Sequence, residues 1–311
     1  MMNSIDIFLE ADHIENKGAT MEICVPRESG FCPGVKRADQ KIRDLAEHHQ
    51  DKKIYILGAL INNQNYLTKL SEQNIMTVGR IEDIPQGEWA VIRSHGLAKS
   101  LQQKLMERGP VLDLTCPKVK AVQGEIEKWA SKAYFLVLNG KNGHPETLGL
   151  LSYNQNHILI TPDSDDQNLY HHLEEIAASK KHKGLFFTSQ TTGHSPTFNR
   201  LTGFADQIGT HHNTQVYHSI CPVIAQKEKS ALILQQDCEL SLVIGDRSSS
   251  NASRLFQRLS QEQKNCYFVT DIEDLKKQAI DFSSVSKAMV VSSASTPLYI
   301  EKEIINYLEN L

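Results

Sequence analysis

The chain has 311 residues, with 33 Lys and Arg against 37 Asp and Glu, a formal net charge of −4 and a pI of about 6.4. This balance provides no basic surface, so neither a nucleic acid nor an anionic membrane is expected as a partner. No apolar run reaches the roughly 18 residues of a membrane span, and residues 1–20 lack the basic start and apolar core of a signal peptide. The cytoplasm, where thiols stay reduced, is therefore the expected compartment.

Residues 1–20 precede the first strand-like apolar run, which begins at Met21. We expect them to form a disordered N-terminal extension, and translation that starts at Met21 instead of Met1 is the alternative. Strands are predicted at 21–26, 53–60, 74–79, 89–94, 111–115, 134–140, 157–162, 184–190, 214–219, 239–246, 265–271 and 288–294. Helices are predicted at 35–49, 97–108, 117–131, 165–180, 195–208, 222–235, 250–261 and 297–310.

The alternation of strands and helices indicates βαβ units, with mostly parallel sheets covered by helices on both faces. Twelve predicted strands in three sets of four favour an α/β fold of three similar modules, although no sequence repeat is evident. The predicted boundaries are 35–115 for the first module, 116–216 for the second, and 217–311 together with 21–34 for the third. No low-complexity linker separates them, so we expect close packing with a site between the modules.

Polar or glycine-rich clusters follow several of the predicted strands. They are Ser94-His95-Gly96, Gly143-His144-Pro145-Glu146, Ser189-Gln190-Thr191-Thr192, Ser248-Ser249-Ser250-Asn251 and Ser292-Ser293-Ala294-Ser295. Ligands of open parallel sheets bind beyond the carboxyl ends of the strands. We therefore expect these clusters to form one surface assembled from the three modules.

The six cysteines fall into two groups. Those in or beside apolar runs are expected to be small buried hydrophobic residues: Cys24, Cys238 and Cys266. Those of the second group end or follow a predicted strand, and each directly precedes a proline: Cys32, Cys116 and Cys221. With only 10 prolines in the chain, three such pairs are not expected by chance.

A proline after a ligand cysteine recurs in iron–sulfur proteins, where it stiffens the turn beside the cluster. The absence of any Cys-x-x-Cys disfavours a zinc ribbon or a thioredoxin motif. The spacing leaves three interpretations open: an iron–sulfur cluster held by three thiolates at the junction of the modules, purely structural cysteines, or zinc. A four-iron cluster with three thiolates has one iron free to act as a Lewis acid, and the cluster also delivers electrons. Reductive removal of a hydroxyl group requires both properties.

An ordered set of short motifs resembles the LytB family, the 4-hydroxy-3-methylbut-2-enyl diphosphate reductases, from about Met21 to the C-terminus. The motifs are Gly30-Phe31-Cys32-Pro33-Gly34-Val35, Ser94-His95-Gly96, Thr115-Cys116-Pro117, Gly143-His144-Pro145-Glu146, Gln190-Thr191-Thr192 and Ser249-Ser250-Asn251. The resemblance implies three α/β modules around a central [4Fe-4S] cluster. It also implies the last step of non-mevalonate isoprenoid synthesis, in which an allylic hydroxyl is lost with two electrons and two protons to give isopentenyl and dimethylallyl diphosphate.

The resemblance also assigns roles to individual residues. Cys32, Cys116 and Cys221 correspond to the metal ligands, Glu146 to the acid that delivers a proton, and Thr191 to a hydroxyl near that acid and the substrate. The expected diphosphate-binding residues are His95, His144, Ser249, Ser250, Asn251 and Ser295, with Asn62 at the position of a further family histidine. The family implies a small allylic diphosphate as substrate and an external electron donor such as a ferredoxin or flavodoxin.

Each of these assignments has a structural alternative. After Pro145, Glu146 suits the first turn of a helix, where a carboxylate interacts favourably with the helix dipole. Ser249, Ser250 and Asn251 are good N-capping residues, although a helix N-terminus with free N–H groups is itself an anion site. Thr191 is equally suited to a turn, and an isolated histidine is more often structural than functional.

The chain departs from the family pattern at several positions. Asn62 occupies the place of a diphosphate-binding histidine, and Gln123 the place of a histidine after the second cysteine. After Cys221 the family usually has Ala-Thr-x-x-Arg-Gln, whereas this chain has Pro222-Val223-Ile224-Ala225-Gln226-Lys227-Glu228. Loss of a charged hydrogen bond weakens diphosphate binding by about 1–3 kcal/mol.

The departures leave three functional interpretations besides an ordinary, divergent reductase. A paralogue would apply the same chemistry to another phosphorylated or hydroxylated substrate. A non-redox [4Fe-4S] hydro-lyase would eliminate water without an electron donor. A sensor or scaffold would have lost catalysis, which the presence of Glu146 argues against.

Overall fold

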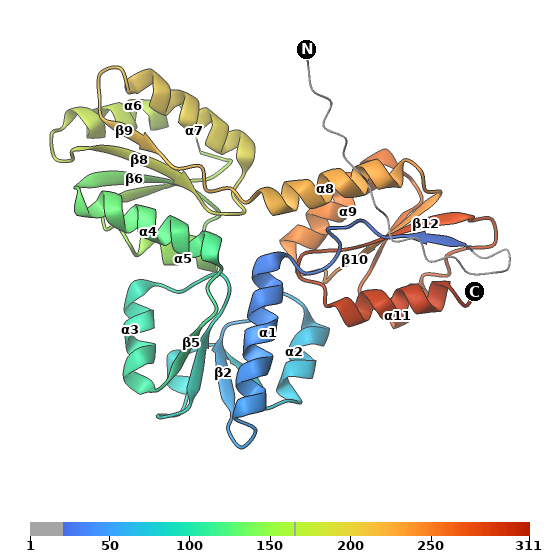
Figure 1. Cartoon of the computed structure of the whole chain (residues 1–311). Coiled ribbons are helices and arrows are strands. Elements are labelled where there is room, and N and C mark those ends of the chain that lie inside the picture. The colour runs from blue at the N-terminus through green and yellow to red at the C-terminus, as the bar shows by residue number, and fades with distance from the viewer. Residues whose placement is uncertain (1–20, 165) are drawn as a thin grey trace, which may run out of the picture. The chain divides into compact units, whose positions relative to one another are not determined.

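The structure is a computed structural model that describes residues 21–164 and 166–311 (Figure 1). Its strands form three separate four-stranded sheets, and every pair of neighbouring strands is parallel. The predicted α/β fold of three parallel-sheet modules is therefore confirmed. The expectation of a disordered extension over residues 1–20 lies outside the described residues.

Each sheet is built from strands and helices that alternate along the chain. One sheet contains β2 (Ile54–Leu57), β3 (Ile75–Val78), β4 (Trp89–Ile92) and β5 (Val111–Asp113), with α1 (Pro33–His48), α2 (Gln64–Ser71), the 3-10 helix η1 (Ile81–Asp83) and α3 (Lys99–Arg108). The next contains β6 (Tyr134–Asn139), β7 (His157–Ile160), β8 (Gly184–Ser189) and β9 (Thr214–Val216), with α4 (Pro117–Ser131), α5 (Pro145–Leu151), α6 (Asp166–Ala178) and α7 (Ser195–Ile208). The last contains β10 (Leu240–Ile244), β11 (Cys266–Val269), β12 (Lys287–Ser292) and β1 (Glu22–Cys24), with α8 (Pro222–Gln235), α9 (Ser250–Glu262), α10 (Ile272–Lys277) and α11 (Leu298–Leu308).

The three sheets share one strand order. The orders are β3-β2-β4-β5, β7-β6-β8-β9 and β11-β10-β12-β1. In each sheet the second strand lies outside the first, and the third and fourth follow on the other side. The N-terminal strand β1 takes the fourth place of the last sheet, where it pairs with β12. The repeat that the sequence does not reveal is thus present in the topology. In every sheet the direction in which successive strands are added reverses between the first and the third strand.

The chain divides into two compact units. Unit 1 comprises the residues up to Lys36, Ile61–Thr68 and Pro222–Leu311, and it contains the β10 sheet. Unit 2 comprises Arg37–Leu60 and Lys69–Cys221, and it contains the β2 and β6 sheets. The module boundaries predicted from the sequence remain predictions.

The β10 sheet is covered on both faces, which explains why the central residues of its strands are mainly apolar. Met289 and Val291 of β12 pack in the same core as Leu255 of α9. Val290, which lies between them, packs on the opposite face in the core that contains Ile304 of α11. Full burial of such a side chain contributes about 1.5–3 kcal/mol. The same alternation divides the two cores on either side of the β6 sheet.

The helices that sequence periodicity does not predict are short. They are α2, α5 and α10, with 8, 7 and 6 residues respectively. A helix of about two turns presents too few apolar positions for a 3.6-residue period to be recognised, and packing rather than propensity stabilises it.

Candidate functional site

The predicted site residues occupy equivalent loops in the three sheets. After the fourth strands β1, β5 and β9 come Cys32, Cys116 and Cys221. After the first strands β2, β6 and β10 come Asn62, the pair His144 and Glu146, and Ser249 to Asn251. After the third strands β4, β8 and β12 come His95, Thr191 and Ser295. The first and third strands flank the point where the strand order reverses, which is where ligands bind in open α/β sheets.

Each cysteine of the Cys-Pro group lies at the N-terminus of a helix. Cys116 is the N-cap of α4, and α1 and α8 begin at the prolines that follow Cys32 and Cys221. All three thiols are half-buried and outside any disulfide. A helix N-terminus has free N–H groups and a partial positive charge, so all three side chains lie where an anionic group or ligand would be bound favourably.

The other group of cysteines is buried, as predicted: Cys24, Cys238 and Cys266. Burial raises the pKa of Cys238 and of Cys266 to about 12. These thiols remain protonated and are poor metal ligands, because the thiolate is the form that binds metal. Within residues 21–164 and 166–311, no three His, Cys, Asp or Glu side chains are arranged to hold a single metal ion.

Six predicted residues of unit 2 are joined by a continuous series of contacts. The amide of Cys116 donates to the carbonyl of Ser94 at 2.9 Å, next to His95. The rings of His95 and His144 meet edge to face, with centroids 5.4 Å apart. His144 caps α5 and accepts from the amide of Glu146 at 3.2 Å.

The series continues from Glu146 to the second cysteine of unit 2. The Glu146 carboxyl accepts from the amide of Thr191 at 2.6 Å and from the Thr191 hydroxyl at 2.8 Å. The amide of Cys221 donates to the Thr191 carbonyl at 2.7 Å. Thr191 therefore hydrogen-bonds both to the predicted acid Glu146 and to the backbone of Cys221.

Glu146 is the most strongly perturbed carboxyl of this site. Its side chain is only 2% exposed, and burial raises its pKa from 4.5 to about 7, although the two hydrogen bonds from Thr191 lower it. The structural alternative also holds, since Glu146 lies in the first turn of α5. A first-turn position does not by itself require burial, and a carboxyl group with a pKa near neutrality is suited to give and regain a proton.

The two histidines predicted to bind the diphosphate, His95 and His144, are neutral at physiological pH. Burial, helped by the charges of Arg93 and His144, lowers the pKa of His95 to about 3. Burial, followed by the charges of Lys141 and Arg93, also lowers the pKa of His144. Because Nδ1 of His144 accepts from the Glu146 amide, its proton must lie on Nε2, which leaves Nε2–H as a donor.

Arg93, directly before Ser94-His95-Gly96, is a cation that the sequence analysis missed. Its guanidinium lies against the backbone of Gly58, where a Cβ would come within 2.6 Å of Nη1. Its Nε is buried without a hydrogen-bond partner among the described residues. The sequence does contain a signal for it, because Arg93 is a charged residue at the end of an apolar strand and lies two positions before the candidate His95.

Gln190, which precedes Thr191, belongs to one of the motifs quoted above, but the sequence assigned it no role of its own. Its side-chain amide donates to Nδ1 of His144 at 3.0 Å, and its carbonyl oxygen accepts from the amide of Lys141 at 3.0 Å. Gln190 therefore links the loop after β8 to the loop after β6. Only the three-dimensional structure reveals this link.

The predicted residues of unit 1 are mainly hydroxyl groups. The Ser249 and Ser295 hydroxyls lie 3.0 Å apart and are buried. Ser249 also caps α9 by accepting from the amide of Ala252, so its structural alternative is realised. The helix begins at Ser250, and Asn251 in its first turn is half-buried. Capping leaves other N–H groups of the first turn free, so it is compatible with anion binding.

Asn62 lies in the segment that precedes α2, and its side chain is exposed. The next residue, Asn63, caps α2 by accepting from the amide of Tyr66 at 2.9 Å. The amide of Gln64 donates to Asp246 at 3.0 Å, and Asp246 also accepts from the amide of Ser248 at 2.8 Å. Asp246 thus fastens the Asn62 segment to the loop that leads to Ser249.

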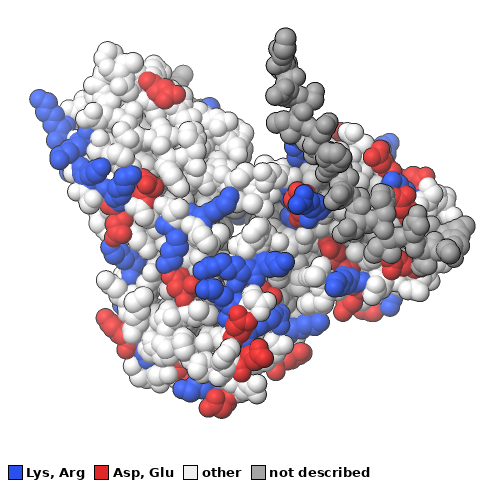
Figure 2. Space-filling model, in the orientation of Figure 1, with Lys and Arg blue, Asp and Glu red and all other residues white. Residues whose placement is uncertain are grey.

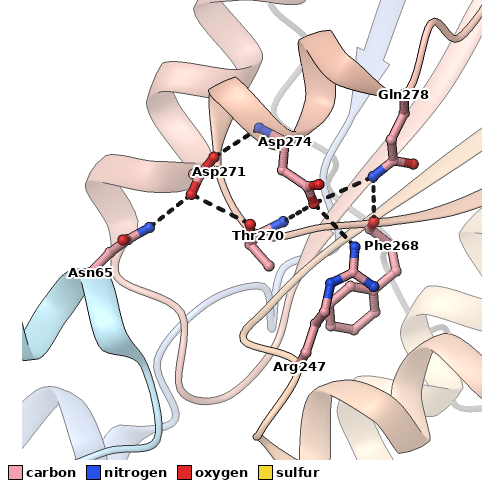
Figure 3. Close-up of polar contacts among 7 residues, drawn as sticks. All are labelled: Asn65, Arg247, Phe268, Thr270, Asp271, Asp274 and Gln278. Atoms are coloured by element: carbon pink, nitrogen blue, oxygen red, sulfur yellow. Dashed lines mark hydrogen bonds and ion pairs between the residues drawn. The ribbon is translucent and has the colours of Figure 1, made fainter.

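A second carboxylate holds the same segment. Asn65 donates to Asp271 at 3.0 Å, and Asp271 caps α10 through the amide of Asp274 at 2.9 Å (Figure 3). Arg247 reaches Asp274 at 3.4 Å and lies over the Phe268 ring (Figure 3). These contacts set the position of Asn62 relative to the serine loop within unit 1.

Charged side chains elsewhere are of both signs. Acidic and basic residues are interspersed over much of the visible face (Figure 2), in keeping with the net charge of −4. Among the described residues, no helix is long and apolar enough to cross a membrane.

A sequence model of the LytB protein family matches residues 23–309. The 4-hydroxy-3-methylbut-2-enyl diphosphate reductase of Clostridium perfringens is 28% identical over 293 residues, which cover 93% of this chain and 99% of that protein. The Aquifex aeolicus reductase of the same name is 27% identical over 293 residues, covering 94% and 97%. A solved structure of (E)-4-hydroxy-3-methyl-but-2-enyl diphosphate reductase, the terminal enzyme of the non-mevalonate pathway, superposes with a TM-score of 0.71 at 27% identity and covers 93% of this chain and 99% of that one.

Proposed function

Because the chain belongs to the LytB family, we propose that it is a [4Fe-4S]-dependent reductase of 4-hydroxy-3-methylbut-2-enyl diphosphate. The reaction replaces the allylic C–O bond by C–H with two electrons and two protons, and it yields water with isopentenyl or dimethylallyl diphosphate. The observation that carries the proposal is the buried Glu146, paired with Thr191 and joined by contacts to the loops of Cys116 and Cys221.

The cysteine set fits an iron–sulfur cluster. Cys32, Cys116 and Cys221 are the half-buried thiols, each beside a helix N-terminus, whereas the buried cysteines are not. When bound, a cluster with three thiolates supplies electrons and one iron that is open to a substrate oxygen. Its placement at the centre of the three modules is part of this proposal.

Glu146 acts as the proton donor. With a pKa of about 7, its protonated form is well populated at neutral pH and can protonate the leaving hydroxyl. Thr191 donates through both its amide and its hydroxyl, and so it stabilises the carboxylate that remains after transfer. Burial of Glu146 favours its return to the neutral acid before the next turnover.

The diphosphate is held by neutral donors and by one permanent charge. His144 contributes Nε2–H, and His95, Ser249, Ser250, Asn251 and Ser295 are the further ligands of the phosphate oxygens. Arg93 lies close enough to lower the pKa of both histidines. It therefore supplies a positive charge beside them, whereas the histidines themselves would be charged only if protonated. Asn62 replaces a histidine of the family by a neutral amide donor.

The electron donor belongs to the same proposal. An external carrier such as a ferredoxin or flavodoxin would supply the two electrons, and a cytoplasmic location would keep the thiols reduced.

The test is anaerobic reconstitution with iron and sulfide, followed by oxidation of reduced viologen on addition of the allylic diphosphate. We expect stoichiometric dye oxidation and both isomeric products. Turnover without dye would identify a hydro-lyase. Dye oxidation with other hydroxylated phosphates but not with this one would identify a paralogue with a different substrate.

A further inference from the structure

The proposed mechanism does not use Lys227, a cation in the interior of unit 1. It lies on α8 and is 2% exposed. Taking an ammonium group out of water is costly unless its donors are satisfied, so a buried lysine requires a specific reason.

Three backbone carbonyls surround the ammonium group. Nζ of Lys227 donates to the carbonyl of Gly30 at 2.8 Å, to that of Ser292 at 3.1 Å, and to that of Glu28. An ammonium group has three protons, so these contacts use all of its donors. Two of the three acceptors belong to the loop that leads into Cys32.

Glu301 of α11 holds the same loop through another side chain. The hydroxyl of Ser29 donates to the Glu301 carboxylate and accepts from the amide of Ser292 at 2.7 Å. Glu301 is itself buried, with 5% exposure. The amide of Gly30 also donates to the carbonyl of Ser292, at 3.1 Å. The loop is therefore tied to α8, to α11 and to the end of β12.

The loop has a conformation that needs such support. Gly30 adopts a left-handed backbone conformation with φ of 74°, and Cys32 follows two residues later without any strand or helix between them. The carbonyl of Cys32 accepts from the amide of Lys36 at 2.9 Å in the first turn of α1. The residues after Cys32 are thus held by the hydrogen bonds of α1, whereas residues 28–30 before it are held by Lys227 and Glu301.

We propose that Lys227 and Glu301 are positioning residues that clamp residues 28–30 and thereby fix the place of Cys32. The importance of that place rests on the proposed role of Cys32 as a cluster ligand, but the clamp itself is a property of the polypeptide. The opposite charges of Lys227 and Glu301 also compensate one another inside unit 1, where either alone would be unfavourable.

The first test is hydrogen–deuterium exchange of the full chain without a cluster. In Lys227→Met the amides of Ser29 and Gly30 should exchange about tenfold faster or more, because hydrogen bonds from a charged donor are lost. Lys227→Arg should retain most of the protection. Lys229→Met, which removes an exposed lysine of the same helix, should leave the loop unchanged.

Two results would overturn the clamp. One is unchanged exchange of Ser29 and Gly30 in Lys227→Met. The other is an equal acceleration in β10 and β12, which would make Lys227 a general support of unit 1. If Lys227→Met does not fold, Ser29→Ala removes the Glu301 side of the clamp with little change in volume, and it should loosen the same amides.

The second test uses the reconstituted protein and measures the rate of iron release to a chelator. Lys227→Met should release iron several-fold faster than wild type, and Lys229→Met should match wild type. If wild type itself takes up no cluster, the proposed function fails, while the exchange experiment still decides the clamp. A loosened loop with unchanged iron release would overturn the inference that the clamp positions Cys32.

Discussion

Units 1 and 2 carry different polar chemistry on sheets of one topology. In unit 2 the site is a titratable group: Glu146 is buried, hydrogen-bonded to Thr191, and has a pKa of about 7. In unit 1 the predicted ligands besides Cys32 are hydroxyls and amides, with Ser249 and Ser295 in contact and Asn62 exposed. The proposed proton donor thus lies in unit 2 beside the histidines His95 and His144, whereas the proposed diphosphate ligands of unit 1 are hydroxyls and amides without a titratable group. Substitutions should separate turnover from affinity accordingly.

The cysteines provide the largest expected effect, because the proposed cluster depends on all three of Cys32, Cys116 and Cys221. Cys32→Ser, Cys116→Ser or Cys221→Ser should abolish or cripple the cluster, measured as iron content and as broad absorption at roughly 400 nm. The matched controls Cys24→Ser, Cys238→Ser and Cys266→Ser should retain it, since these thiols are buried. Equal cluster loss in both groups would refute the division of the cysteines.

Glu146→Gln should keep the cluster and substrate affinity but lower kcat by about 100-fold or more, the usual scale for loss of a general acid. Steady-state kinetics give kcat and KM, and single-turnover kinetics give the rate of the chemical step. Glu125→Gln, on a partly exposed carboxylate of α4 that pairs with Lys128, is the control and should have normal kcat. A wild-type kcat in Glu146→Gln would remove this residue from the mechanism.

The pH dependence sharpens the assignment to unit 2. Because burial raises the pKa of Glu146 to about 7, kcat should fall as pH rises through that value, and Glu146→Gln should lack this limb of the profile. The free energy of unfolding should change in the same direction. Because the pKa of Glu146 is higher in the folded state than its ordinary value of 4.5, its contribution to stability is fully present below pH 4.5 and is lost as the pH rises through about 7. A profile that is flat between pH 6 and pH 8 in wild type would contradict the assignment.

Substitutions in unit 1 should act on affinity. Ser249→Ala with Ser295→Ala should raise KM for the diphosphate by about tenfold or more, with kcat changed much less, since each hydrogen bond to a charged group is worth about 1.5–3 kcal/mol. Loss of the α9 cap should cost only about 0.5–2 kcal/mol of stability. His194→Ala, which removes the cap of α7, controls for capping. Reduced stability with unchanged KM would show that the serines are structural.

Asn62→His should have the smallest effect. In a divergent reductase the imidazole would regain a donor to the diphosphate and tighten binding about tenfold, which corresponds to 1.4 kcal/mol. Anaerobic calorimetric titration compares it with wild type and with the neutral control Asn62→Gln. Tight binding by wild type that histidine does not improve would show that Asn62 with Arg93 suffices. Weak binding by all three would favour a paralogue with its own substrate.

The sequence by itself determined the α/β class and the division of the cysteines. Strands buried on both faces are mainly apolar, and so they are visible as runs such as Leu240–Ile244, in which Ser241 is the only polar residue. A Cys-Pro pair at a strand end is equally local, since the proline begins the next helix, as Pro117 begins α4. Both signals depend only on residues adjacent in the chain.

The tertiary structure alone decided which loops act together. The pKa of Glu146 is raised by burial and lowered in part by the hydrogen bonds from Thr191, which is 45 positions away. The place of β1 beside β12, the contact of Arg93 with Gly58 and the clamp formed by Lys227 likewise join distant segments. Burial and electrostatic interaction are set by all neighbours in space, and no local pattern of residues encodes them.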